Sequence, residues 1–424
     1  MFEFIENLEF DYKKIGLLTG FILLSAILAY GIYALFFKPA TVVITPPDIN
    51  IVDTDGNLPT TQTGDGTNIA GPGANGLPTA GSEDTSAGTV STEDAADVAH
   101  GGLTKTTILN QSPSSAVTLA SNQSELLFYN QNNGKFYRVN SSGQINALSD
   151  KTFFNVQSVV WSPKSNKAII EYPDGANIVY DFSTNKQVTL PKHWEEFNFS
   201  PSGDQLVSKS IGLDPDNRWL IVTNDDGSEA RSIEALGKNA DSVHSSWSPN
   251  NLSVALFTES IDLDRQRLYF IGQNKENFKA TVIEGRGLEH QWAPDGKKLI
   301  YSVHSSSSDL KPELWIVDAQ GDEIGSNRRK LNLQTWAHKC SLPSSDIIYC
   351  AVPETLPEGA GLFPELANNT RDYIYKVNLK TGASNLVAIP DNNSSIDTLI
   401  VPPEENKIYF TDTQSGSIHS MRLQ

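Results

Sequence analysis

Short runs in which apolar and polar side chains alternate recur along the C-terminal three-quarters of the chain. In one unit, residues 288–292 and residues 297–303 flank the turn Pro294-Asp295-Gly296. Alternation with a period of two is typical of a β-strand with one buried face. Proline presets φ, aspartate can bond its own backbone and glycine supplies positive φ, so the pattern predicts a hairpin.

The same unit continues into two further strands and is then repeated. A third strand is predicted over residues 313–318 and a fourth over residues 329–333. The sequence motif, or phrase, that opens the unit occurs four times, at Trp161-Ser162-Pro163, Phe199-Ser200-Pro201, Trp247-Ser248-Pro249 and Trp292-Ala293-Pro294. Neighbouring copies lie about 38 to 48 residues apart, which is the length that four short strands with turns require.

Degenerate copies begin near Cys340 and near Leu399, and another copy without the phrase lies at residues 116–129. The pattern therefore predicts an all-β fold, a seven-bladed β-propeller over residues 105–424 with about 46 residues per blade. Six blades are the alternative. The last copy has three predicted strands, so residues 105–110 are expected to supply the fourth and close the ring.

These phrases resemble the TolB-type, WD-like propeller repeat, in which an aromatic-Ser-Pro-Asp-Gly turn opens the blade. The match is best over residues 292–299, Trp-Ala-Pro-Asp-Gly-Lys-Lys-Leu, and the resemblance covers residues from about 150 to 352. It implies the fold. It does not assign an activity, because propellers serve in catalysis, docking and scaffolding alike.

A different pattern precedes the repeats. Residues 15–37 contain no charged side chain. A segment of this length is long enough for a helix to cross about 30 Å of hydrocarbon. Lys13 and Lys14 precede this segment, and no Lys or Arg follows Lys38 until Lys105. The positive-inside rule then predicts a cytoplasmic tail at residues 1–14 and a propeller outside the membrane. A cleaved signal peptide is the alternative.

Residues 38–104 are rich in Gly, Thr, Pro and Asp and contain no aromatic residue. A segment of this composition cannot build a core, so a disordered linker is expected between the membrane and the propeller. The formal net charge of the chain is −18, of which −8 falls on residues 105–424. A negative ring repels phosphate backbones, so no nucleic-acid partner is expected.

Only two cysteines occur, Cys340 and Cys350, and the register places them on the first two strands of one hairpin. They are candidates for a cross-strand disulfide, which an exported location permits, and two buried free thiols are the alternative. Closing so short a loop would stabilise the fold by about 3 kcal/mol in the chain-entropy model.

Candidate chemistry is sparse. The chain lacks a Gly-x-Ser-x-Gly elbow, a Gly-rich phosphate loop and a His-Glu-x-x-His motif, so we expect no enzyme, no cofactor and no metal. Some polar side chains near the starts of the innermost strands are candidates for a site in the central channel: Glu196, His244, Glu289, His290 and His338. Strand alternation places His244 on the face opposite to that of His290 and His338, which argues against one metal site.

The segment that differs most from the repeat is residues 353–372, an insertion between the second and third strands of the Cys340 blade. Its apolar residues Leu356, Leu362, Phe363 and Leu366 must pack either on the propeller itself or on a partner. We therefore predict a binding scaffold for a protein or a cell-envelope polymer, anchored in the membrane. A hydrolase or lyase with its site in the channel is the alternative.

Overall fold

The computed structural model describes residues 94–423, together with five helical positions, Phe21, Leu23, Ser25, Leu28 and Tyr30. The chain divides into two units, Met1–Thr85 and Ser86–Gln424. Within the described part of the chain, no helix is both long enough and apolar enough to cross a bilayer. The predicted tail, most of the predicted membrane segment and residues 38–93 of the predicted linker lie outside the described residues.

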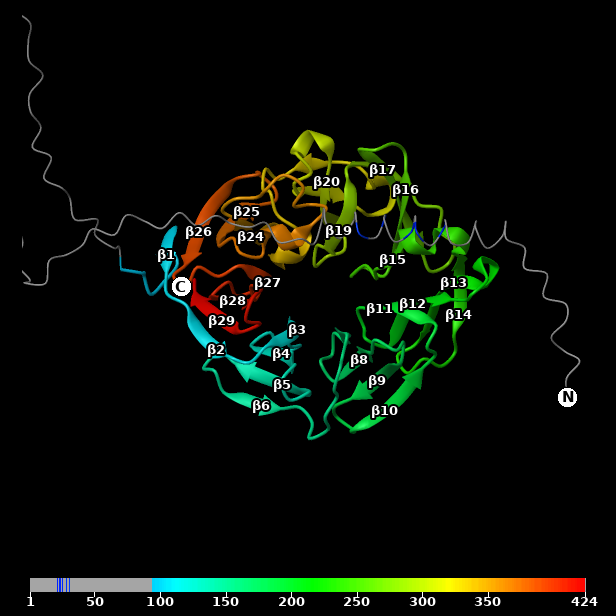
Figure 1. Cartoon of the computed structure of the whole chain (residues 1–424), viewed down its shortest axis with the longest axis horizontal. Helices are drawn as coiled ribbons and strands as arrows, with labels where there is room; N and C mark the ends of the chain where they lie inside the picture. Colours follow the sequence, from blue (N-terminus) through cyan, green and yellow to red (C-terminus); the bar gives the residue numbers. More distant parts are fainter. Residues whose placement is uncertain are drawn as a thin grey trace, which may run out of the picture. The chain divides into compact units, whose positions relative to one another are not determined.

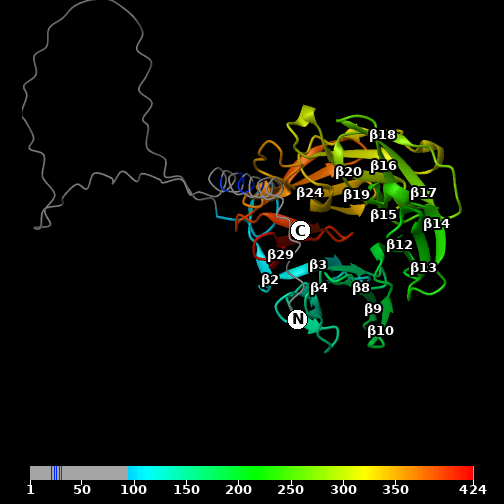
Figure 2. The ribbon, with the colours of Figure 1, turned by 45° about the vertical axis from the view of Figure 1, so that its right-hand side comes forward.

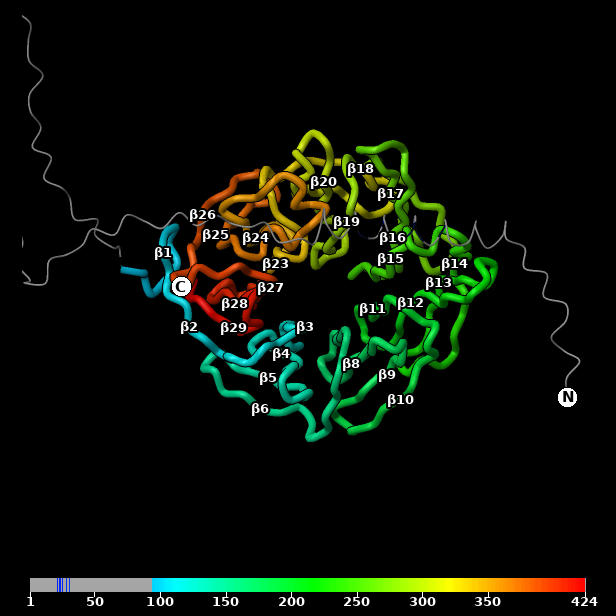
Figure 3. The backbone as a smooth tube through the Cα atoms, in the orientation of Figure 1, coloured from blue at the N-terminus to red at the C-terminus, as the bar shows by residue number. Residues whose placement is uncertain are grey.

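The second unit contains a ring of seven β-sheets, as Figure 1 shows. Each sheet is one blade, and its strands follow one another from the centre of the ring outward, as the backbone trace in Figure 3 makes clear. The structure thus confirms the prediction of seven blades over the alternative of six.

The blades are numbered along the chain. Blades 1 to 3 contain β3 (Ser114–Leu119), β4 (Glu125–Asn130), β5 (Lys135–Asn140), β6 (Ile145–Ala147); β7 (Ser158–Trp161), β8 (Lys167–Glu171), β9 (Asn177–Asp181), β10 (Lys186–Leu190); and β11 (Trp194–Phe199), β12 (Gln205–Ile211), β13 (Arg218–Asn224), β14 (Arg231–Ala235). Blades 4 and 5 contain β15 (Val243–Ser245), β16 (Ser253–Ser260), β17 (Arg265–Gly272), β18 (Thr281–Glu284); and β19 (Arg286–Trp292), β20 (Lys298–His304), β21 (Glu313–Asp318), β22 (Arg329–Lys330).

Blades 6 and 7 contain β23 (Cys340–Ser344), β24 (Ile347–Pro353), β25 (Asp372–Asn378), β26 (Ser384–Pro390); and β27 (Ile396–Ile400), β28 (Lys407–Asp412), β29 (Ile418–Arg422). The loops include short 3-10 helices, η1 (Pro215–Asn217), η2 (Gly237–Ser242), η3 (Ser306–Ser308), η4 (Gly321–Glu323), η5 (Ala337–Lys339) and η6 (Pro364–Ala367).

The ring closes by pairing the N-terminal part of the second unit with its C-terminal strand. β2 (Thr107–Asn110) pairs antiparallel with β29 and completes blade 7, as the sequence predicted for residues 105–110. β1 (Gly102–Thr104) adds a fifth, parallel strand to β26 of blade 6. β1 was not predicted and falls in the range assigned to the linker, so ordered structure begins before Lys105.

The turn between the first two strands of blade 5 also contacts blade 4. Gly296 has φ +68°, and a Cβ at this position would lie 2.6 Å from the backbone nitrogen of Asn250 in the turn of blade 4. The Asn250 side chain donates a hydrogen bond of 2.7 Å to the Gly296 carbonyl. Glycine is therefore required twice here, for the backbone conformation and for the close approach of the next blade.

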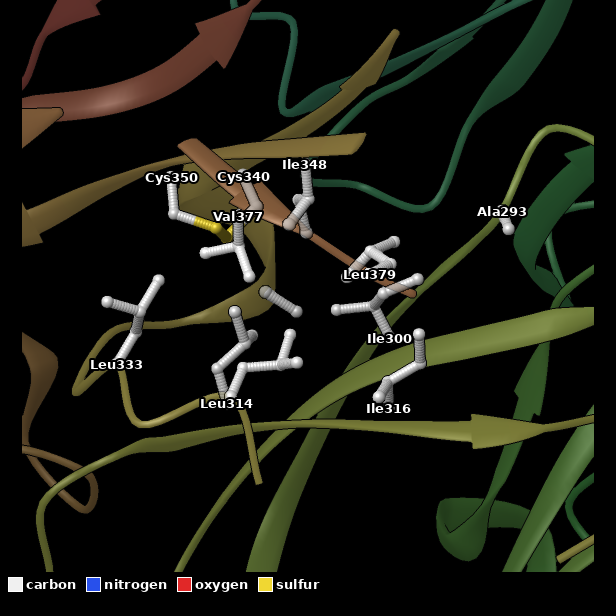
Figure 4. Packing of buried hydrophobic residues seen from close by; sticks show 12 residues of the cluster. Ala293, Ile300, Leu314, Ile316, Leu333, Cys340, Ile348, Cys350, Val377 and Leu379 are labelled. Atoms are coloured by element: carbon white, nitrogen blue, oxygen red, sulfur yellow. A yellow bond between two sulfur atoms is a disulfide. The ribbon is translucent and has the colours of Figure 1, made fainter. Parts of the chain in front are cut away.

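Apolar side chains fill the space between consecutive blades. Figure 4 shows one such cluster, in which Ile300 and Ile316 of blade 5 pack against Ile348 and Val377 of blade 6. All four side chains are buried. Because each blade covers the face of the next, removing one blade would expose two apolar faces to water.

Cys340 and Cys350 lie directly opposite each other on β23 and β24 and are joined by a disulfide. Both belong to the same buried cluster, where the yellow bond in Figure 4 marks them. The covalent bond ties the innermost strand of blade 6 to its second strand, at a blade that lacks the opening tryptophan.

Replacing Leu109 with alanine should lower the free energy of unfolding by about 2–5 kcal/mol, because Leu109 of β2 is buried against blades 1 and 7. The neighbouring Ile108 on the same strand is 50% exposed, so Ile108→Ala should change stability by less than about 0.5 kcal/mol. Urea unfolding followed by circular dichroism measures both. Equal effects of the two substitutions would contradict the ring closure.

Candidate binding face

The two faces of the ring carry different loops. We call the face where the first strand of each blade begins the entry face; it carries the loops between second and third strands, including residues 212–217, 261–264, 305–312 and 354–371. The opposite face carries the Trp-Ser-Pro turns, and we call it the turn face. All five histidines and glutamates predicted for the channel lie on the first strands of their blades or just before them.

A β-bulge changes the direction of side chains on the first strand of blade 3. The register between β11 and β12 shifts between Glu195 and Asn198, and Glu196 has φ +53°. Glu196 forms an ion pair of 2.9 Å with Lys209 of β12, whose side chain is almost completely buried. Bulges near the ring centre turn side chains away from the regular alternation, so sequence periodicity alone could not place Glu196.

Glu196 also reaches the next blade. The backbone N–H of Ser245 in β15 donates to Glu196 Oε2 over 3.3 Å. Burial lowers the pKa of the neighbouring His244, while the Glu196 carboxylate acts in the opposite direction. The structure thus brings Glu196 and His244 together across blades 3 and 4.

A second pair lies across blades 5 and 6. Glu289 Oε2 is 2.6 Å from His338 Nδ1, and both side chains are partly exposed. A carboxylate beside an imidazole can hold or transfer a proton, and solvent can reach this pair. It is separate from the Glu196–His244 pair, because the two pairs share no hydrogen-bonding or ion-pair partner.

His290 takes part in a contact between two blades. Its Nε2 lies 2.7 Å from Ser246 Oγ of blade 4, and Trp292 Nε1 donates to the same oxygen over 2.8 Å. Burial lowers the pKa of His290 to about 4. Ser246 is itself buried and such a histidine is a weak base, so this serine–histidine contact joins two blades and lacks the exposed nucleophile that catalysis needs.

The five predicted channel residues therefore form two pairs and one contact between blades. Among the described residues, no group of three or more His, Cys, Asp or Glu side chains could hold a metal ion.

Sequence reasoning missed Glu171 at the end of β8. Burial raises the pKa of this carboxyl, Ser158 acts against the shift, and the charges of Glu196 and Glu195 raise it further.

A buried ion pair at the base of the insertion was also missed. Lys339 Nζ lies 2.8 Å from Asp372 Oδ2, and both side chains are almost completely excluded from solvent. The same carboxylate accepts the backbone N–H of Ile396 in blade 7 over 2.6 Å. Asp372 ends the insertion, so this pair anchors the insertion to blades 6 and 7. Nothing in the sequence distance between 339 and 372 indicates the contact.

The insertion crosses from blade to blade over the entry face. Gly359 and Gly361 donate backbone hydrogen bonds of 2.9 and 2.7 Å to the carbonyls of Asp309 and Leu310 in the blade 5 loop. In the blade 7 loop, Gln414 Nε2 donates to Asn369 Oδ1 over 2.9 Å. Fixed contacts with blades 5 and 7 hold the insertion in one place.

The four apolar residues of the insertion divide into two sets. Leu356 packs against buried Trp336, Ala360 and Ala367. The remaining three stay exposed: Leu362 by 51%, Phe363 by 56% and Leu366 by 47%. Self-packing thus accounts for one side of the insertion, and the other side presents three large apolar side chains to solvent.

No family model matches the chain, and no curated protein matches it. Among solved structures, the chain is similar to the β-propeller domain of Cps50 (Swd1) from Myceliophteria thermophila, at 11% identity and a TM-score of 0.52, covering 75% of this chain and 100% of that one. An oligogalacturonate lyase in complex with manganese has 14% identity and a TM-score of 0.47, with coverage of 75% and 93%. TolB from Acinetobacter baumannii has 12% identity and a TM-score of 0.37, with coverage of 70% and 63%. At these identities the likeness shows the fold alone, a β-propeller.

Replacing His290 with glutamine should weaken the pH dependence of stability. The folded-state pKa of about 4 lies below the unfolded value of 6.5, so the folded protein keeps His290 neutral while the unfolded chain binds a proton. The contribution of neutral His290 is complete above about pH 6.5 and is lost as the pH falls toward 4, by on the order of 3 kcal/mol. Urea unfolding at both ends of this range measures the loss.

His290→Gln should show a smaller loss of stability between the two pH values than the unmodified chain does. The matched control is His100→Gln, whose side chain is exposed, and this variant should keep the full loss. Identical losses in the unmodified chain and in His290→Gln would show that His290 does not contribute.

Proposed function

We propose that this protein is a membrane-anchored, extracytoplasmic β-propeller that acts as a binding scaffold for a protein or a cell-envelope polymer. The observation that carries the proposal is the exposed row Leu362, Phe363 and Leu366 on an insertion that neighbouring blades hold in place. Large apolar side chains in contact with water favour burial against a partner. Since the backbone beneath them is already ordered, binding requires little further loss of conformational entropy.

Two features support an exported location. The disulfide between Cys340 and Cys350 is typical of proteins that fold in an oxidising compartment. The uncharged segment 15–37, preceded by Lys13 and Lys14, has the length and flanking charge of a membrane anchor with its N-terminus inside. On this proposal the tether keeps the ring near the outer surface of the membrane.

The alternative is a hydrolase or lyase that works at the centre of the ring. It would depend on Glu289 and His338, because this carboxylate–imidazole pair is open to solvent, whereas the Ser246 hydroxyl that His290 contacts is buried. The exposed apolar row has no role in such an enzyme, and this favours the scaffold.

Deleting residues 1–38 should release the protein from the membrane fraction. The anchored location also predicts that both cysteines are oxidised in cells, so a thiol-reactive polyethylene glycol should label neither cysteine in denatured protein before reduction and both afterwards. Alkaline extraction of membranes and gel-shift labelling of whole-cell samples measure these outcomes. A protein that stays in the soluble fraction with two free thiols would contradict the anchored, exported arrangement.

Replacing Leu362, Phe363 and Leu366 together with serine should remove binding of the partner. Burying one such side chain contributes about 1.5–3 kcal/mol, so loss of three should lower recovery of the partner more than about tenfold. Cross-linking in cells, followed by affinity purification and quantitative mass spectrometry, measures it. The matched control replaces Ile145, Val188 and Leu252 with serine. These three residues are exposed on other surfaces of the ring, so recovery of the partner should be unchanged. Equal recovery from both triple variants would overturn the proposed binding surface.

A further inference from the structure

A hollow with a volume of about 610 Å³ lies between blades 3 and 4, away from the insertion. On blade 3 it is lined by Trp219 of β13 and by residues of β14, and on blade 4 by residues of β16, β17 and the loop 273–280. Figure 2 shows these two blades as neighbours. The volume falls within the range of sites that hold small organic ligands.

Aromatic rings form much of the blade 4 side of this hollow. Phe257 and Tyr269 lie opposite each other on β16 and β17, and their rings stack with centroids 5.4 Å apart at an interplanar angle of 20°. Both side chains are half-buried. They therefore present a flat, partly solvent-accessible apolar surface.

The loop 273–280 folds back over Gly272 at the end of β17. A Cβ at Gly272 would lie 2.1 Å from Glu276 Oε2 and 2.9 Å from the Phe278 ring. Arg231 of blade 3 donates to Gln273 Oε1 over 2.8 Å and so links this loop to the neighbouring blade. The loop brings Lys275, Glu276, Asn277 and Phe278 to the hollow.

Some polar side chains in the hollow form hydrogen bonds with the protein, and others do not. Glu276 accepts hydrogen bonds from the backbone and side-chain nitrogens of Asn274. Glu234, Lys275 and Asn277 are exposed, and their side chains are not engaged in any hydrogen bond or ion pair with residues 94–423. A carboxylate, an ammonium and an amide thus remain able to bind a ligand beside the stacked rings.

We propose that this hollow binds a segment of neutral oligosaccharide. A pyranose ring has an apolar C–H face that can lie on an aromatic surface and hydroxyl groups at its edges that a carboxylate, an amide and an ammonium can bind. Two carboxylates, Glu234 and Glu276, outnumber the single ammonium of Lys275, so an acidic sugar would be repelled. The inference rests on the proposed function and selects, for this site, a neutral glycan as the envelope polymer.

Titration calorimetry with the full-length chain in a detergent without sugar head groups tests the inference. The neutral probes are maltohexaose, cellohexaose and chitohexaose, and the acidic comparison is trigalacturonate. We expect at least one neutral probe to bind with a Kd below about 1 mM and trigalacturonate to bind at least about tenfold more weakly. Absence of binding by all three neutral probes at millimolar concentration would overturn the proposal.

Two substitutions locate the site. Tyr269→Ala and Glu234→Gln should each weaken binding of the neutral probe at least about tenfold, because they remove a stacking ring and a charged acceptor. The matched control is Tyr137→Ala, which removes one ring of a similar stacked pair, Phe128 and Tyr137, in blade 1. This control should leave binding unchanged, and equal weakening by Tyr269→Ala and Tyr137→Ala would overturn the location.

Two further results separate the possible causes of failure. Decaproline that binds more tightly than the sugars, and loses affinity in Tyr269→Ala, would show a peptide site and overturn the glycan proposal. The serine variant of Leu362, Phe363 and Leu366 should keep sugar binding, because these residues do not line the hollow. If this variant loses its partner while no sugar binds the unmodified chain, the scaffold function stands and the glycan site does not.

Discussion

The fold depends on one pairing, that of β2 with β29. Blades 1 to 6 each take four strands from one continuous stretch of chain, whereas blade 7 takes three strands from the C-terminal part and its fourth from residues 107–110. Each blade buries apolar side chains against its two neighbours, so the ring has no free face only when this last sheet is complete. Leu109 places a buried side chain at the junction of blades 1 and 7, which couples the backbone pairing to the packing of the core. β1 extends this arrangement by covering the outer edge of blade 6, where an open strand edge could otherwise pair with another chain.

A closed ring of this kind leaves its loops free to differ, and the entry face shows the consequence. The insertion of blade 6 is held by the loops of blades 5 and 7 and by the buried Lys339–Asp372 pair, so its position depends on three blades. Breaking either partner of a buried ion pair leaves an uncompensated charge, which makes this anchor costly to lose. The exposed side of the insertion is therefore presented on a rigid support, as a binding surface requires. The hollow between blades 3 and 4 has a similar origin, since its lining comes from two blades and from the loop 273–280.

The histidines near the centre illustrate how one repeat can serve different purposes. His290 lies two residues before Trp292, and both side chains bond Ser246 of the preceding blade, where burial favours a neutral imidazole. His338 stands two residues before Cys340, yet it meets a carboxylate of blade 5 in a place that solvent reaches. Equivalent positions in the repeat thus have different electrostatic environments, because the neighbouring blade supplies the partner in each case.

Local features of the structure could be predicted from the amino-acid sequence. Alternation with a period of two, turns such as Pro294-Asp295-Gly296 and the spacing of the repeats predicted the strands, the seven blades, the closing strand at residues 105–110 and the place of the insertion. The contacts between side chains of different blades could not be predicted and became clear from the folded ring. The pairs Glu196–His244, Glu289–His338 and Lys339–Asp372 and the lining of the hollow join residues far apart in the chain, and bulges such as that at Glu196 break the alternation from which side-chain direction would be inferred. Local patterns specify hydrogen bonding within a strand or turn, whereas contacts between blades depend on the twist and packing of complete sheets, which no short segment encodes.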